Sequence, residues 1–550
     1  MRKRKGADGI QLQAIAGSSV VLLGWDMSRQ DSRGVLGFGV HRTDHTENEA
    51  YWLTGTKTFA ETDPGLGPGS HYSTRNHPVQ GFTWSDFTAK PGYRYTYRVV
   101  ALRGTPSELR EEEAVEATVS TEREGQGGHA VWFNRGAAAS QEYARRFQNR
   151  KPSEVGRPAF EWLSRGLEEA LLAFIEQARG PGWGLRVAAY QFTYPPVLEA
   201  LRQAHQRGVD VRILYDARGS EVAAPNRQAV DQARIKGLCV ERTANPGKIA
   251  HNKFIVLLRS GRPVAVWTGS TNFTEGGIFG HSNVGHAVRD ADVARAYAQY
   301  WDQLHLDPEA KDLRLWVGQE SPTPMPGGRP VAGETTLFSP RSGTQLLEWY
   351  GELAGSAKSL LCMTFPFGIS SHFHPVFEAA FPGLRYALLD SKGNQRNAEQ
   401  MILALRSKVF NRFAIGNFIK QNKFDRWLGE QLSGLNRHAR YIHTKYMLVD
   451  PLGRDPVVIS GSANFSDASV RDNDENMLVI RGNKRVADIY LTEFFRLWNH
   501  YAFREWAAKQ EHPATSEFRH LEPDDSWRSV YYGNTDRARQ RMLFAGTLEA

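Results

Sequence analysis

The sequence predicts an α/β protein in which an all-β sandwich precedes two similar lobes that form a pseudo-dimer. A polar pattern occurs twice at constant spacing, apolar strands and helices alternate around each copy, and residues 10–121 lack any long helical period. With 550 residues and 41% apolar content, the chain can bury several cores. We expect a sandwich over 1–121, lobes over 129–317 and 334–505, and an extension of unknown role over 506–550.

The N-terminal region is expected to consist of short strands separated by Gly, Pro and Asp. Tyr93, Tyr95 and Tyr97 alternate within residues 91–101, so they share one face of a strand. This short stretch resembles the late strand of fibronectin type III domains, which implies an immunoglobulin-like sandwich. We expect a spacer, adhesion or partner-docking role for it, with a plain structural cap as the alternative.

The first lobe is expected to begin after a Glu- and Gly-rich join at 122–128. Its predicted elements are a helix over 161–178, a strand over 185–192, a helix over 196–207, a strand over 209–215 and a closing helix over 290–305. The β-α-β order indicates a parallel sheet that is covered by helices.

The second lobe repeats this order after a connector at 318–333 that holds four prolines and four glycines. Its predicted elements are a strand over 359–365, a helix over 373–380, a strand over 384–389, a helix from residue 398 and a closing helix over 484–500. Because order and pattern are both duplicated, we expect the two lobes to face one cleft within a single chain.

The repeated pattern is His-x-Lys followed, after a strand and a hairpin, by Gly-Ser-x-Asn. The first copy is His251, Lys253, Gly269, Ser270 and Asn272, and the second is His443, Lys445, Gly461, Ser462 and Asn464. Each position is displaced by the same number of residues, as in 443 − 251 = 192. A lone His-x-Lys carries little information, but two copies in one register predict a shared site.

This duplication resembles the phospholipase D superfamily, whose signature is a doubled His-x-Lys-x4-Asp followed by Gly-Ser-x-Asn. The resemblance covers residues 129–505 and implies phosphodiester chemistry through a phosphohistidine. Asp450 holds the aspartate position in the second copy, whereas Leu258 replaces it in the first. Strand alternation puts both positions on the face opposite the histidines, so we expect Leu258 to leave the reacting groups intact.

The same alternation places each lysine on the side of its histidine. Two lysines and two asparagines could then stabilise a pentacoordinate phosphorus without a metal. No Asp, Glu or His cluster with metal-ligand spacing accompanies the motifs, so we expect no catalytic metal and no cofactor.

A histidine that attacks phosphorus needs an orienting partner, and the superfamily supplies a carboxylate or amide shortly after Gly-Ser-x-Asn. Glu475 and Asn283 occupy these positions in the second and first copies. We expect Asn283 to keep His251 neutral as the nucleophile. We expect Glu475 to hold His443 protonated as the acid, because a carboxylate stabilises imidazolium.

The substrate class is predicted from charge and composition. The net charge of +8 favours polyanionic partners. Residues 409–428 interleave aromatic with basic side chains, which suits base stacking, docking at a lipid interface, or simply an amphipathic helix packed on its lobe. We favour a nuclease acting on DNA or RNA over a phospholipase D acting on phospholipid head groups. A catalytically weakened polyanion-binding protein is the third alternative.

The compartment is predicted from the cysteines and the N-terminus. Cys239 and Cys362 lie in apolar runs, which favours buried free thiols in a reducing compartment. Residues 1–5 are basic like the start of a signal peptide, but the apolar run that follows is short, and no stretch has the roughly 20 apolar residues of a membrane span. We therefore expect a cytoplasmic protein.

Overall fold

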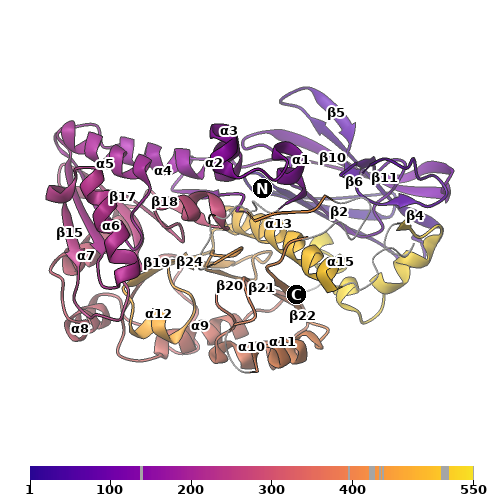
Figure 1. Cartoon of the computed structure of the whole chain (residues 1–550). Helices are drawn as coiled ribbons and strands as arrows, with labels where there is room; N and C mark the ends of the chain where they lie inside the picture. Colours follow the sequence, from indigo (N-terminus) through magenta and orange to yellow (C-terminus); the bar gives the residue numbers. More distant parts are fainter. Residues whose placement is uncertain are drawn as a thin grey trace.

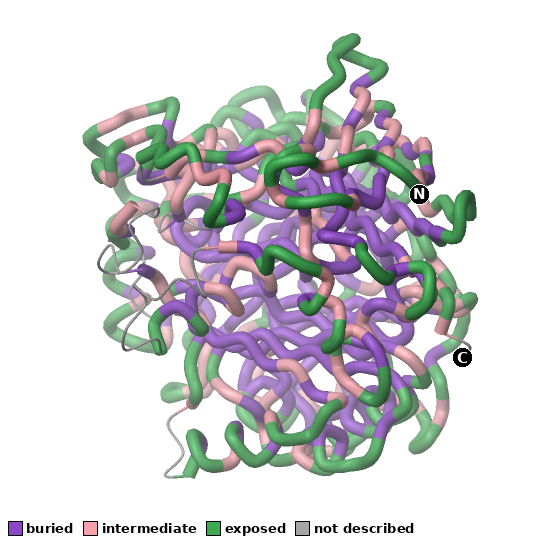
Figure 2. Tube along the Cα trace, turned by 90° about the vertical axis from the view of Figure 1, so that its right-hand side faces the viewer, coloured by how far each residue is buried: buried purple, intermediate pink, exposed green. Residues whose placement is uncertain are grey.

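A computed structural model describes residues 1–67, 69–136, 140–393, 397–419, 428–432, 435, 439–509 and 520–548. Figure 1 shows the β-sandwich beside two α/β lobes, with the long helix α13 (Lys484–Lys509) running between them. The trace is buried through the centre of the molecule, and exposed segments lie mainly at its rim (Figure 2). Within the described residues, no helix has the length and apolar character needed to cross a bilayer.

The N-terminal region is a sandwich of two four-stranded antiparallel sheets, so the predicted all-β class is confirmed. One sheet has the order β1-β2-β3-β9 and the other β11-β10-β4-β5. The strands are β1 Arg2–Ala7, β2 Ile10–Ala16, β3 Val21–Met27, β4 Val35–Asp44, β5 Glu49–Trp52, β9 Thr83–Asp86, β10 Arg94–Thr105 and β11 Glu108–Ser120. Tyr95 and Tyr97 are fully buried between the sheets. The likeness to fibronectin type III domains stays a prediction.

The C-terminal extension completes the sandwich, a role that the sequence did not reveal. Strand β26 (His520–Leu521) pairs in parallel with β7 (Thr58–Phe59). Trp527 enters the sandwich core, and its indole N–H donates to the Val35 carbonyl oxygen at 2.9 Å. Helix α15 (Asp536–Ala545) then packs on β3 and against α13, so the sandwich is anchored to the second lobe.

The first lobe contains a seven-stranded sheet with the order β12-β18-β17-β16-β13-β14-β15. The strands are β12 His129–Phe133, β13 Trp183–Ala189, β14 Asp210–Asp216, β15 Cys239–Arg242, β16 Lys253–Arg259, β17 Arg262–Gly269 and β18 Val284–Val288. The helices are α1 Gln141–Phe147, α2 Pro152–Val155, α3 Arg157–Ser164, α4 Leu167–Glu176, α5 Pro195–Gln206, α6 Ser220–Gln232, α7 Ala291–His305 and α8 Ala310–Glu320.

Two details of the first lobe differ from the prediction. The predicted parallel sheet is mixed, because only β13, β14 and β15 are parallel to one another; the tight β16–β17 hairpin makes its strands antiparallel. The predicted helix over 161–178 is two helices, because Arg165 and Gly166 adopt left-handed backbone angles and end the first one.

The second lobe repeats this sheet strand for strand, with the order β19-β25-β24-β23-β20-β21-β22. The strands are β19 Gly333–Ser339, β20 Leu360–Phe365, β21 Leu384–Leu389, β22 Asn411–Ile415, β23 Tyr446–Val449, β24 Val457–Gly461 and β25 Glu475–Arg481. The helices besides α13 are α9 Gln345–Gly355, α10 His374–Glu378, α11 Ala398–Arg406 and α12 Asp467–Arg471. The predicted pair of similar α/β lobes is therefore confirmed.

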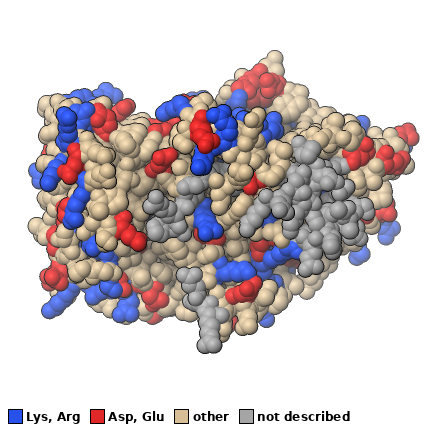
Figure 3. All heavy atoms as spheres, in the orientation of Figure 1, with Lys and Arg blue, Asp and Glu red and all other residues tan. Residues whose placement is uncertain are grey.

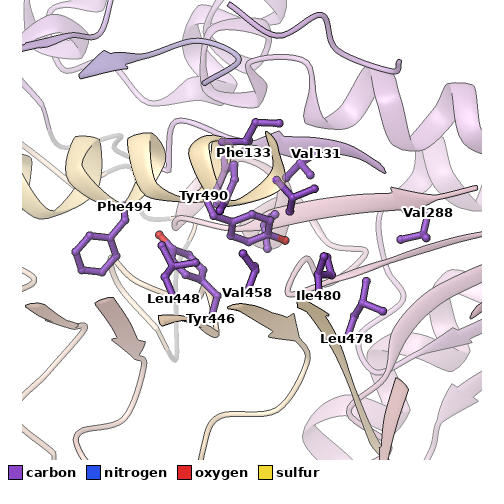
Figure 4. Close-up of a cluster of buried hydrophobic side chains, with 14 of the residues drawn as sticks. Val131, Phe133, Val288, Tyr446, Leu448, Val458, Leu478, Ile480, Tyr490 and Phe494 are labelled. Carbon is purple, nitrogen blue, oxygen red and sulfur yellow. The ribbon is translucent and has the colours of Figure 1, made fainter. Parts of the chain in front are cut away.

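The two lobes share one hydrophobic core rather than packing as separate units. Side chains from both sheets and from α13 meet in it, as Figure 4 shows for Val131, Phe133, Val288, Tyr446, Leu448, Val458, Leu478, Ile480, Tyr490 and Phe494. The outer faces of the sheets carry their own helix-covered cores. Burying the inner faces against each other fixes the register in which the two motifs meet.

Candidate active site

The structure brings the two His-x-Lys segments together where the sheets meet. His251 and Lys253 stand at the start of β16, and His443 and Lys445 immediately precede β23. The ring centroids of His251 and His443 are 6.4 Å apart. The two residues are only 4% and 6% exposed, so the pair lies in a largely desolvated site.

The two lysines are also buried and point toward their own histidines. The Lys445 ammonium donates to the His443 carbonyl oxygen at 2.5 Å, and Lys253 makes the same contact with His251. Lys253 also lies 5.1 Å from the ring centroid of Tyr190, within cation–π range. Two cations therefore flank the histidine pair without a carboxylate bound to either ammonium among the described residues.

The Gly-Ser-x-Asn turns fold against the strand that follows them. A Cβ atom on Gly269 would lie 2.2 Å from the Val284 carbonyl oxygen, so only glycine fits this turn. The Ser270 hydroxyl accepts from the Val284 N–H at 3.1 Å and donates to the Asn283 side-chain oxygen at 2.8 Å. These contacts carry Asn272 to the edge of the site.

The second turn repeats this geometry. A Cβ atom on Gly461 would lie 2.2 Å from the Asn476 carbonyl oxygen. The Ser462 hydroxyl accepts from the Asn476 N–H at 3.0 Å. The two serines thus brace the turns, and the Asn464 side-chain oxygen is buried without a hydrogen-bond partner among the described residues.

The orienting groups are exchanged between the lobes, which corrects the predicted pairing. His251 Nδ1 lies 2.9 Å from the Glu475 carboxylate, and His443 Nδ1 lies 2.9 Å from the Asn283 side-chain oxygen. Each histidine is therefore oriented by the residue of the opposite lobe. The expected pairs, His251 with Asn283 and His443 with Glu475, are wrong because Glu475, at the start of β25, and Asn283, just before β18, each face the histidine of the other lobe.

Burial dominates the electrostatics of the site. It lowers the pKa of His251 to about 4, although Glu475 opposes this shift. It also lowers the pKa of His443 well below its usual range, and there Lys445 adds to the effect while no carboxylate opposes it. Burial brings the pKa of Lys253 to about 7, and that of Lys445 is lowered as well. Both histidines are thus neutral in the free protein.

Two buried aspartates, which the sequence pattern did not point to, bind the residue that precedes each motif histidine. Asp216 accepts from the Ala250 N–H at 2.9 Å, and Asp390 accepts from the Ile442 N–H at 2.7 Å. Each amide belongs to the residue before a motif histidine. Asp216 is the last residue of β14 and Asp390 follows the last residue of β21, and an acidic residue at that strand end was the available sequence signal.

A buried ion-pair group joins the lobes next to Glu475. Arg242 donates to Asp474 at 3.0 Å and to Asp307 at 2.5 Å, and Arg218 also donates to Asp474. Because Asp474 precedes Glu475 in the chain, these arginines of the first lobe hold the segment that carries the carboxylate. No local pattern in the sequence reveals such contacts between lobes.

Two more side chains close to the motifs were not predicted. The His281 ring centroid lies 4.6 Å from that of His443. Gln191 accepts from the Asn272 side-chain amide at 2.8 Å, which orients that amide in the first lobe.

The aspartate position of the motif is structural in both lobes. Asp450 accepts from the backbone N–H groups of Lys358, Ser359 and Leu360, which begin strand β20. Leu258 instead packs in the core that the lobes share.

The aromatic and basic stretch over 409–428 is described only in part. Residues 411–415 form the edge strand β22, Phe413 is buried, and Arg412 pairs with Asp536 at 2.7 Å. These side chains are therefore not available for base stacking, contrary to that interpretation. Residues 420–427, with the remaining aromatic and basic positions, lie outside the described residues.

Cys362 is buried and Cys239 is half-buried, and both are free thiols. In the part of the chain that the structure describes, no three His, Cys, Asp or Glu side chains gather as a set of metal ligands.

Two facing lobes each contribute a histidine and a lysine to one buried site, an arrangement suited to phosphodiester chemistry. A family model described as "Cardiolipin synthase, PLD-like domain" matches residues 171–305 and 393–498. These two segments contain the two motifs. Both lobes are therefore similar to a phospholipase D-like domain, and the similarity supports a phosphodiester hydrolase.

Similar proteins include the human mitochondrial cardiolipin hydrolase, which is 24% identical over 194 residues, or 35% of this chain and 69% of the relative. Among solved structures, the phosphatidylserine synthase of Haemophilus influenzae is 14% identical, with 63% of this chain and 89% of that chain covered and a TM-score of 0.42. The polyphosphate kinase of Porphyromonas gingivalis is 13% identical, and the similarity covers 58% of this chain but only 46% of that one, with a TM-score of 0.38.

Proposed function

We propose that this protein is a metal-independent phosphodiesterase that cleaves nucleic acid through a phosphohistidine on His251. The observation that carries the proposal is the buried contact between His251 Nδ1 and the Glu475 carboxylate at 2.9 Å. A ring that keeps its proton on Nδ1 presents the lone pair of Nε2 to phosphorus. Once Nε2 is phosphorylated the ring is cationic, and Glu475 stabilises that charge.

In the first step His251 Nε2 forms the bond to phosphorus, and the bond between phosphorus and the leaving oxygen breaks. His443, protonated in the substrate complex, gives its Nε2 proton to that oxygen. The Asn283 amide offers no negative charge to stabilise imidazolium, so a protonated His443 is a strong acid. The sequence predicted that Glu475 would hold His443 protonated, but Glu475 contacts His251 instead. The acidity of His443 is therefore attributed to the neutral amide of Asn283.

In the second step the neutral His443 takes a proton from water as the water oxygen attacks phosphorus. The bond from phosphorus to His251 breaks, and the electron pair returns to Nε2. The phosphomonoester leaves, and His443 is protonated for the next cycle. Lys253, Lys445, Asn272 and Asn464 are proposed to bind the non-bridging oxygens in both steps.

The case for nucleic acid rests on charge. The net charge of +8 favours a polyanion. On the face shown in Figure 3, basic and acidic side chains are interspersed, so recognition of phosphate would depend on the buried cations of the site rather than on a surface patch there.

Hydrolysis of a phospholipid head group is the second candidate. It is favoured by the similarity to a relative named mitochondrial cardiolipin hydrolase, at 24% identity. Both candidates use the same bond chemistry, so they differ only in what is attached to the phosphate.

The deciding experiment incubates the purified protein, in excess EDTA, with single-stranded DNA, duplex DNA, RNA and anionic vesicles in separate reactions. Cleavage of a nucleic acid that is lost in His251→Ala supports the proposal. Release of a head group from the vesicles without cleavage of any nucleic acid replaces it with the second candidate. Activity that appears only when a divalent ion is restored contradicts the metal-independent mechanism.

A further inference from the structure

A second repeated element lies beside the motifs. Strand β14 ends at Asp216 and is followed by Ala217-Arg218-Gly219, and the equivalent strand β21 is followed by Asp390-Ser391-Lys392-Gly393. The displacement is 390 − 216 = 174 rather than the 192 of the motifs, because the segment up to the histidine is longer in the second lobe. Both copies lie at the carboxyl edge of the parallel strands, where ligands of open α/β sheets bind.

Arg218 contacts the two segments next to the His251–Glu475 contact. Its Nε is 3.6 Å from Asp216, whose carboxylate accepts from the residue before His251. Its Nη2 donates to Asp474, the residue before Glu475. The guanidinium thus contacts both of the segments that carry the His251–Glu475 contact.

Part of this guanidinium has no partner although it is buried. The Arg218 side chain is 1% exposed, yet its Nε and Nη1 make no hydrogen bond among the described residues. A buried N–H without an acceptor destabilises the fold, and more so when it is charged. Native structures tolerate such groups mainly where function uses them, so a missing acceptor points to a ligand.

Arg218 is not needed to hold Asp474. Arg242 donates to the same Asp474 oxygen at 3.0 Å and is itself held by Asp307 at 2.5 Å. With Asp474 held in this way, the free N–H groups of Arg218 remain for another acceptor.

The helix that follows Arg218 supports an anion at this place. Helix α6 (Ser220–Gln232) begins after Gly219, and no side chain caps its N-terminus. Its first N–H groups and the positive end of its dipole favour an anion. The positive charge at this place is limited by the exposed Glu221 in the first turn of α6 and by Asp216 and Asp474. The place therefore suits a single anion bound at a defined position rather than any polyanion.

We propose that Arg218 binds the phosphate next to the scissile one in a nucleotide chain. Lys392, at the equivalent position of the second lobe, would meet the chain on the opposite side of the site; it is exposed and pairs with Glu399. The inference rests on the proposed function and deepens it. A phosphate on each side of the scissile bond is a property of a nucleotide chain, which an isolated phosphodiester does not share.

The first test changes only the substrate. Single-stranded oligonucleotides would carry an uncharged methylphosphonate at one position at a time, and cleavage would be mapped at the linkages on either side. We expect removal of the neighbouring charge to slow cleavage at least tenfold on one side of the modification. Unchanged cleavage on both sides would overturn the inference. If the wild-type protein cleaves no oligonucleotide at all, the proposed function itself fails, and this inference fails with it.

The second test removes the guanidinium. Arg218→Gln should slow oligonucleotide cleavage at least tenfold more than hydrolysis of bis(p-nitrophenyl) phosphate, which has no neighbouring phosphate. In this variant the methylphosphonate should cost less than a further twofold. Arg227→Gln, which removes an exposed arginine of α6 that pairs with Glu241, is the matched control and should preserve the full methylphosphonate effect. Equal losses on both substrates would mean that Arg218 acts through Asp474 and Glu475, and would overturn the inference.

Discussion

The two lobes contribute the same three residue types to the site, but they give their histidines different chemical environments. His251 of the first lobe contacts a carboxylate of the second, whereas His443 of the second lobe contacts an amide of the first. The sheets that carry them match strand for strand. A duplicated fold can therefore give two equivalent histidines different roles by changing the one side chain that orients each of them.

The lobes also differ at the residues around the shared chemistry. Asn272 of the first lobe is oriented by Gln191. At the aspartate position of the motif, Asp450 holds the start of a strand in the second lobe, while Leu258 fills the shared core in the first. The first difference concerns a group that is proposed to bind phosphate, whereas the second concerns packing and the start of a strand.

The largest expected effect separates the two histidines. His251→Ala should lower turnover by at least about 10⁴-fold and form no covalent adduct with any substrate. His443→Ala should still allow attack on a p-nitrophenyl phosphodiester, whose leaving group needs no proton. Its adduct should accumulate because no base activates water. Intact-protein mass spectrometry after an acid-free quench would detect the phosphohistidine, which is acid-labile.

The same measurement can reverse the assignment. An adduct in His251→Ala, together with none in His443→Ala, would make His443 the nucleophile. The carboxylate of Glu475 would then hold His251 as the acid, and the exchange of partners between the lobes would serve the opposite division of roles.

The next effect concerns the orienting groups. Glu475→Gln should slow turnover roughly 10²- to 10³-fold, because the cationic ring of the intermediate loses its counter-charge. Asn283→Asp should place a carboxylate beside His443 and raise the pKa of its ring, so His443 would stay protonated to higher pH. The check is the pH profile of kcat, whose alkaline limb should move to higher pH in Asn283→Asp. An identical profile in both variants and the wild type would mean that the amide and the carboxylate are interchangeable.

A smaller effect concerns pH in the free protein. Burial lowers the pKa of His251 to about 4 and that of Lys253 to about 7. The nucleophile gains its neutral form as pH rises through about 4, and Lys253 loses its charge as pH rises through about 7. We therefore expect kcat/KM, which reports the free enzyme, to rise as pH increases through about 4 and to fall as pH increases through about 7. In kcat the alkaline limb should lie higher, because bound phosphate favours the charged forms of Lys253 and of His443, the acid of the first step. A kcat/KM that stays flat up to pH 9 would contradict this account.

The sequence predicted the lobes and the six motif residues because their spacing is constant. It could not predict the exchange of orienting groups, because strand alternation describes one lobe at a time and the exchange depends on how two lobes face each other. For the same reason, the sequence could not predict contacts between residues that are far apart in the chain. Examples are Arg242 with Asp474 and the C-terminal extension with the sandwich core. Residues 411–415 were misinterpreted because a pattern of aromatic and basic residues does not distinguish a core-facing edge strand from a nucleic acid-binding surface, whereas the prediction for 420–427 stays a prediction.

The smallest expected effect on catalysis concerns Asp450 and Leu258. Asp450→Ala should lower the free energy of unfolding by about 2–4 kcal/mol, because the N–H groups of Lys358, Ser359 and Leu360 lose their acceptor. Leu258→Asp should also destabilise the protein, because it puts a carboxylate into the shared core. Both variants should keep kcat within about tenfold once corrected for the folded fraction, since neither side chain faces phosphate. Urea unfolding monitored by tryptophan fluorescence gives the stabilities, and hydrolysis of bis(p-nitrophenyl) phosphate gives kcat. A hundredfold gain in kcat for Leu258→Asp would show instead that the first lobe is degenerate, and the lobes would then differ in activity as well as in role.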